Sequence, residues 1–110
     1  MIQAKLYRKN DRLCGFRISG HADYAPGGAD IVCAAVSVLA FNTVNAVEKL
    51  TEVPFQCEAD AENGGYLKVL FPIEGMEAAD VQLLLETLAL GLAGIEMEYG
   101  SYITLKIEEV

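Results

Sequence analysis

The sequence of 110 residues contains a single histidine and three cysteines with no C-x-x-C pair. One histidine and scattered cysteines do not provide the four clustered ligands of a structural zinc site, so we expect no metal. No uninterrupted apolar run reaches the roughly 18 residues of a membrane span, so we expect no membrane partner. The first residues alternate like a strand and lack the layout of a signal peptide, which together with the cysteine pattern predicts a reducing, cytoplasmic location.

Basic side chains are also scarce. Eight lysines and arginines stand against sixteen aspartates and glutamates, for a net charge of −8. The charge is unevenly spread, since residues 1–17 hold five basic side chains and one acidic one, and the remainder holds three and fifteen. An acidic body does not suit phosphate neutralisation, so we expect no direct nucleic-acid partner. The acidity either steers a basic protein toward this one or merely keeps the chain soluble.

Alternating and helical patterns together predict one α+β domain over residues 1–110. Period-2 alternation marks strands at 2–8, 12–20, 53–61, 66–71 and 101–108, and helical spacing of apolar residues marks helices at 31–49 and 76–96. The pair Asn10-Asp11 predicts a tight hairpin turn between the first two strands. The order β-β-α-β-β-α-β predicts a two-layer sandwich, with a five-stranded, mainly antiparallel sheet and two helices on one face.

The same patterns predict that two cysteines are buried in the core and that two leucines add apolar surface to the second helix. Cys14 and Cys57 fall on the inward faces of their strands, so both are predicted to be small core residues. Leu83 and Leu90 widen the apolar stripe of the second helix beyond what one sheet face needs. This excess packs either on the first helix or on a partner subunit, and it favours a homodimer.

The third cysteine lies just inside the start of a long apolar helix. Asp30 is suited to cap that helix, because its side-chain oxygen can accept the free N–H groups of the first turn. Cys33 is then the third helical residue, where the helix N-terminus would stabilise a thiolate. His21 stands twelve residues earlier, and Gly27-Gly28 gives the intervening loop a flexible point. Ser37 lies one turn after Cys33 on the same face and bonds either near the thiol or back to the Cys33 carbonyl.

The segments from Gly20 to Ala22 and from Gly28 to Ser37 resemble the signature of the bacterial ribosomal-processing cysteine proteases. The resemblance implies a protease that removes a short N-terminal extension from a large-subunit ribosomal protein, without a cofactor. Cys33 would be its nucleophile and His21 its general base and acid, while backbone N–H groups around Cys33 would bind the oxyanion. Residues 22–29 would form a loop that orders over the bound peptide.

Other interpretations of the same residues stay open. Without the resemblance, a cysteine and a histidine twelve positions apart are more often a buried thiol and a surface imidazole. The chain could instead be a non-catalytic, ribosome-associated module that clamps a peptide, or a redox sensor that uses Cys33. The loop could be an ordinary strand-to-helix connection, and either Asp23 or Asp30 could orient His21.

Overall fold

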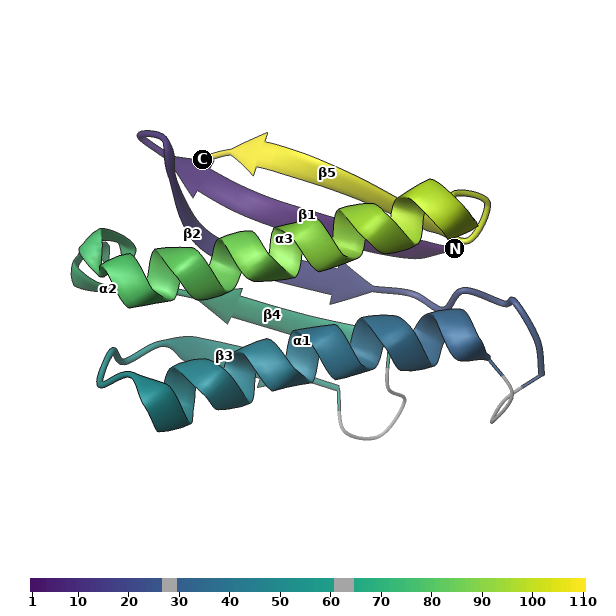
Figure 1. Cartoon of the computed structure of the whole chain (residues 1–110), viewed down its shortest axis with the longest axis horizontal. Coiled ribbons are helices and arrows are strands. Elements are labelled where there is room, and N and C mark those ends of the chain that lie inside the picture. Colours follow the sequence, from purple (N-terminus) through teal and green to yellow (C-terminus); the bar gives the residue numbers. More distant parts are fainter. Residues whose placement is uncertain (27–29, 61–64) are drawn as a thin grey trace.

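A computed structural model describes residues 1–26, 30–60 and 65–110. The strands in these residues are β1 (Ile2–Lys9), β2 (Arg12–Ser19), β3 (Gln56–Ala59), β4 (Tyr66–Leu70) and β5 (Ile103–Glu109). The helices are α1 (Ile31–Leu50), α2 (Ile73–Glu77) and α3 (Ala79–Tyr99). The strands form one sheet in the order β3-β4-β2-β1-β5, and α1 and α3 lie side by side over one of its faces (Figure 1).

This arrangement confirms the predicted two-layer α+β fold and adds two features. The pairing of β1 with β5 is parallel, whereas the other three pairings are antiparallel, so the sheet is mixed. The expected second helix is interrupted at Ala78, whose φ of −75° and ψ of 119° are extended. The break leaves α2 as a separate short helix before α3.

The turn between β1 and β2 is formed by the two residues that predicted it. Asn10 and Asp11 have φ values of 53° and 63°, both in the left-handed region. Two consecutive positive φ values characterise a type I′ turn, whose twist matches that of the flanking strands. Asparagine and aspartate tolerate this conformation better than most residues, so local chemistry sets the register of the hairpin.

The core lies between the sheet and the helices. The different burial of Cys14 and Cys57 shows that it does not extend to β3. Alternate residues of the central strands point into it; Leu6 and Phe16 are almost completely buried. Cys14 is buried, as predicted, but Cys57 is exposed, so that prediction was wrong. Cys57 belongs to β3, an edge strand in which all four residues are exposed. Alternation identifies one face of a strand but not whether anything covers that face.

Helix α1 is long and apolar enough to cross a membrane by length and composition, with a mean hydropathy of 1.7. In this structure its inner side is buried in the domain core; the residues concerned are Val32, Val36, Ala40, Thr43 and Val47. The core helix of a two-layer domain passes the same compositional test, and α1 packs as such a core helix.

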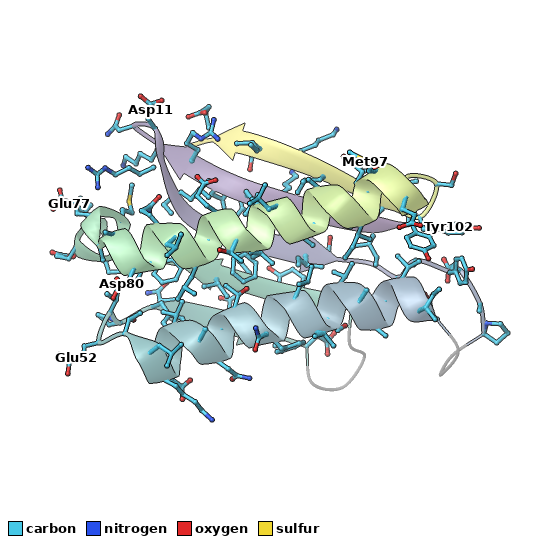
Figure 2. All side chains as sticks on the ribbon, viewed as in Figure 1. Asp11, Glu52, Glu77, Asp80, Met97 and Tyr102 are labelled. Carbon is cyan, nitrogen blue, oxygen red and sulfur yellow. The ribbon has the colours of Figure 1, made fainter. Side chains whose placement is uncertain are left out.

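The outer side of α3 carries an apolar stripe that nothing described covers. Leu83, Leu90 and Met97 are spaced seven residues apart and are 68%, 75% and 90% exposed. Since α1 does not cover them, the excess apolar surface predicted for this helix remains open. Figure 2 shows Met97 on α3 near the end of the molecule that holds Tyr102. Acidic side chains such as Asp11 and Glu77 lie at the opposite end (Figure 2).

Candidate active site

The end of β2, the start of β4 and the start of α1 lie close together at one end of the molecule (Figure 1). Hydrogen bonds of Asp30 hold the start of α1 to the segment that follows β2. Its Oδ1 accepts the N–H groups of Val32 at 3.1 Å and Cys33 at 3.0 Å, which confirms the predicted N-cap. Its Oδ2 accepts the N–H of Tyr24 at 3.2 Å. These bonds, chiefly the one from the Cys33 amide, hold the pKa of the Asp30 carboxyl below its usual value. One carboxylate therefore ties the segment after His21 to the first turn of α1.

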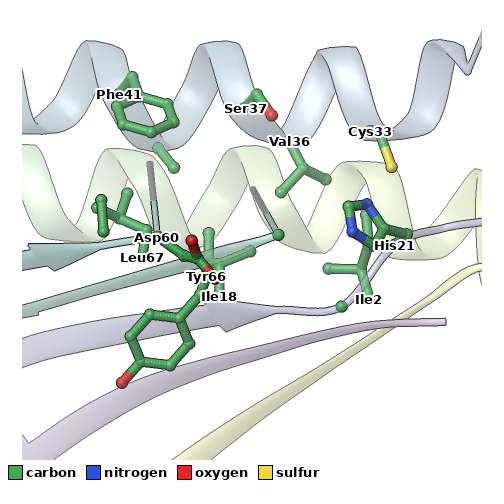
Figure 3. Close-up of a pocket in the computed structure, with 14 residues that line it drawn as sticks. Ile2, Ile18, His21, Cys33, Val36, Ser37, Phe41, Asp60, Tyr66 and Leu67 are labelled. Carbon is green, nitrogen blue, oxygen red and sulfur yellow. The ribbon is translucent and has the colours of Figure 1, made fainter. Parts of the chain in front are cut away.

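Cys33 and His21 face the same space. The Cys33 side chain is half-buried, and its Sγ accepts the backbone N–H of Ala22 at 3.2 Å. His21 is exposed at the end of β2, and in Figure 3 the Cys33 sulfur projects from α1 toward the His21 imidazole. Both side chains line the same two cavities. The structure therefore brings the Cys33 thiol and the His21 imidazole to the same space.

The environment of the thiol differs from the one predicted. The pKa of Cys33 is raised above its usual value, first by burial and further by the carboxylates of Asp30 and Asp23. The hydrogen bond from the Ala22 amide acts in the opposite direction and is outweighed. Stabilisation of a Cys33 thiolate by the helix start therefore stays a prediction, and burial and the capping carboxylate act against it.

The same cap occupies the amides that were expected to bind an oxyanion. The Val32 and Cys33 N–H groups donate to the Asp30 side chain, and the Ala34 N–H donates to the Asp30 carbonyl at 3.1 Å. The Ala22 N–H remains as the described backbone donor aimed at the reacting sulfur.

Two cavities meet at Cys33 and differ in chemistry. The first, of about 240 Å³, runs between α1 and the sheet; apolar side chains line most of it, including Ile18, Val36, Phe41 and Leu67 (Figure 3). The second, of about 420 Å³, lies on the side of the segment that follows His21 and is lined by Asp23 and Asp30 among others. The Cys33 side chain lines both cavities.

Two glycines hold the backbone around His21, and one of them was missed from the sequence. Gly20 has a φ of +87°, and a Cβ there would stand 2.6 Å from the Met1 carbonyl oxygen. Its N–H donates to the Gly65 carbonyl at 2.8 Å. Gly65 lies against the imidazole, since a Cβ built on it would stand 2.7 Å from Nε2 of His21. The sequence signal that could have identified Gly65 is the pair Gly64-Gly65 directly before the predicted strand at 66–71.

The remaining predicted site residues are placed as follows. Ser37 lines both cavities, but among the described residues its hydroxyl makes neither of the two expected hydrogen bonds. Asp23 forms an ion pair at 4.0 Å with the N-terminal ammonium group. Within the described part of the chain, neither Asp23 nor Asp30 hydrogen-bonds His21. Gly27 and Gly28 lie outside the described residues.

An aromatic cluster anchors the described part of the segment after His21. The Tyr24 ring packs edge-on against Tyr99 and Tyr102, with ring centroids 5.8 Å and 5.0 Å apart. Such pairs contribute roughly 0.5–1.5 kcal/mol beyond the burial of their area.

Within residues 1–26, 30–60 and 65–110, no group of three or more His, Cys, Asp or Glu side chains is placed to hold a metal ion.

Comparisons with known proteins identify the family of this chain. Residues 1–104 match the family model of cysteine protease Prp. The ribosomal processing cysteine protease Prp of Bacillus subtilis (strain 168) is 38% identical over 103 residues, which cover 90% of each chain. The crystal structure of the essential ribosomal processing protease Prp from S. aureus with a covalently linked product peptide has a TM-score of 0.92 and 31% identity, over 98% of this chain and 100% of that one.

Two further structures have the same fold. SMU.848 from Streptococcus mutans gives a TM-score of 0.88 at 37% identity, over 100% of this chain and 96% of its own. The S. aureus protease with a substrate peptide gives 0.83 at 29% identity, over 98% of this chain and 100% of that one. With a family match across nearly the whole chain, this chain belongs to the family of Prp ribosomal processing cysteine proteases and is a cysteine endopeptidase.

Proposed function

We propose that Cys33 is the nucleophile and His21 the general base and acid of an endopeptidase that removes a short N-terminal extension from a large-subunit ribosomal protein. The observation that carries the assignment is the shared position of Cys33 and His21 on the walls of both cavities. The substrate follows from the relatives, which are named ribosomal processing proteases. The covalently linked product peptide in the S. aureus structure supports a covalent mechanism.

The raised pKa of Cys33 determines how the first step proceeds. Because burial and the nearby carboxylates disfavour the thiolate, His21 removes the thiol proton as the sulfur attacks the scissile carbonyl. The Ala22 N–H, already directed at Sγ, stabilises the negative charge that develops there. With the amides of the first helical turn occupied by Asp30, the Ala22 N–H is also the donor we assign to the oxyanion.

The later steps use the same two side chains. Protonated His21 gives its proton to the leaving amine, the peptide C–N bond breaks, and the acyl group remains on Cys33 as a thioester. A water molecule then gives a proton to His21 and attacks the thioester carbonyl. The carboxylic acid product leaves, and the sulfur recovers its proton from His21.

The cavities suggest what the substrate presents around the cut. The apolar cavity beside Cys33 suits an aromatic or leucine side chain, since burial of such a group stabilises binding by roughly 1.5–3 kcal/mol. Asp23 and Asp30 give the second cavity a negative charge that suits the basic segments of ribosomal proteins. Asp23 and Ala25 also line this second cavity, which supports a role for the segment after His21 in covering the peptide.

We also propose that the protein acts in the cytoplasm as a homodimer. The support for the dimer is the exposed stripe of Leu83, Leu90 and Met97 on α3. Exposed large apolar side chains gathered on one helix face are typical of an interface. A second copy of the chain would bury this stripe against its own.

Cleavage is tested by the intact mass of a large-subunit ribosomal protein that carries its N-terminal extension. We expect the protein to produce one defined truncation, Cys33→Ala to abolish it and His21→Ala to slow it by roughly 10²–10⁴-fold. Cys57→Ala, which removes an exposed thiol on β3, is the matched control and should cleave normally. Binding without cleavage by the unmodified protein would instead establish the peptide-binding module, and cleavage by Cys33→Ala would exclude the proposed nucleophile.

The effect of Asp30 on the thiol is tested by alkylation. Asp30→Asn retains a capping oxygen but removes the charge that raises the pKa of Cys33, so the thiolate should form at lower pH. In a Cys57→Ala background, we expect iodoacetamide to modify Cys33 several-fold faster at pH 7.5 than without the change, as followed by mass spectrometry. Asp80→Asn, in the first turn of α3, should leave the rate unchanged. An unchanged or slower rate in Asp30→Asn would contradict this account of the thiol.

The dimer is tested by sedimentation equilibrium at micromolar concentration. A charge in the middle of the apolar stripe should disrupt the interface, so Leu90→Glu is expected to sediment as a monomer and the unmodified protein as a dimer. Lys49→Glu, in the last turn of α1, is the control for the change in charge and should remain dimeric. A monomeric unmodified protein, or a dimer that tolerates Leu90→Glu, would rule out this interface.

A further inference from the structure

We infer that Gly65 is a positioning residue for His21: the lack of a side chain at residue 65 keeps the imidazole beside Cys33. The inference rests on the proposed role of His21 and extends it to the start of β4. Gly65 touches no reacting atom of Cys33 in this account and acts only through the histidine.

The contact between the two residues leaves no room for a methyl group. A Cβ built on Gly65 would stand 2.7 Å from Nε2 and 2.9 Å from Cε1 of His21. Both distances are below 3.0 Å, a separation that real Cβ atoms essentially never show. The same atom would lie 3.2 Å from the Gly20 carbonyl oxygen. The Nε2–Cε1 edge of the imidazole therefore packs directly on the backbone of residue 65.

The backbone on both sides of this contact is held in place, so the imidazole is what would move. The Gly20 N–H donates to the Gly65 carbonyl at 2.8 Å, and Tyr66 pairs with Ser19 in the ladder between β4 and β2. The Asp60 N–H donates to the Tyr66 carbonyl at 3.2 Å. These bonds fix residue 65 relative to the residue that precedes His21, and a side chain added there would turn or displace the imidazole.

Displacement of the imidazole bears directly on the reaction. A general base has to lie within hydrogen-bond reach of the proton that it abstracts. Misplacement of a reacting group by about 1 Å can lower the rate by roughly 10²-fold. Burial and nearby carboxylates raise the pKa of Cys33, so its activation depends on where His21 lies.

Backbone conformation provides a second reason for glycine at residue 65, and it has to be separated from the first. Gly65 has a φ of +70°, which strains alanine but is tolerated by asparagine. Both replacements carry the same Cβ. If strain alone matters, Asn should behave nearly like Gly; if the contact with His21 matters, Asn and Ala should be impaired alike.

The experiment compares Gly65→Ala, Gly65→Asn and the control Gly94→Ala, whose Cβ would meet nothing within 4 Å. His21 is the only histidine, so its imidazole NMR signals need no further assignment. We expect both changes at residue 65 to shift these signals and to lower kcat for peptide cleavage by at least roughly tenfold. The control should change neither. Thermal unfolding of each variant reports any loss of stability separately.

Each outcome decides the inference. Impaired Ala and Asn variants with shifted imidazole signals support it, and the Asn variant alone supports it if Gly65→Ala does not fold. An Asn variant with unmoved imidazole signals and near-normal kcat would overturn it in favour of strain. If the unmodified protein cleaves no peptide, the proposed function fails, whereas the imidazole signals still show whether residue 65 positions His21.

Discussion

The active end of this molecule depends on the hydrogen bonds of one carboxylate. Asp30 accepts the N–H groups of Val32 and Cys33 with one oxygen and that of Tyr24 with the other. The first pair fixes where α1 begins and places Cys33 in its first turn. The third bond brings the segment after His21 over the helix start, where the Ala22 N–H reaches the sulfur. Asp30 therefore joins the segment that follows His21 to the helix start that carries Cys33.

The Asp30 carboxylate also opposes deprotonation of the Cys33 thiol. Burial raises the pKa of the Cys33 thiol, and the nearby carboxylates raise it further. A thiol is a poorer nucleophile than a thiolate and a poorer target for oxidants, so the proposed reaction needs a base to accept the proton. Placement of the histidine then matters more than the basal acidity of the cysteine. The neighbours of His21, Gly20 and Gly65, are accordingly both glycines in the left-handed region.

Local features were predictable from the sequence, and long-range ones were not. The cap at Asp30 and the turn at Asn10-Asp11 follow from side chains that satisfy nearby backbone, so both predictions were confirmed. Cys57 was placed wrongly because alternation does not show that β3 lies at an edge of the sheet. The contact of Gly65 with His21 arises from packing between segments distant in sequence. The pairing of β1 with β5 across the whole chain is of the same kind.

The central claim is that Cys33 reacts because a bound peptide brings its carbonyl to a thiol served by His21. The most direct measurement is the site of modification by a peptide vinyl sulfone built on the N-terminal extension, read by peptide mapping. We predict modification of Cys33 and not of the more exposed Cys57, and a large loss of rate in His21→Ala. Modification of Cys57 in preference to Cys33, or an unchanged rate in His21→Ala, would contradict the account.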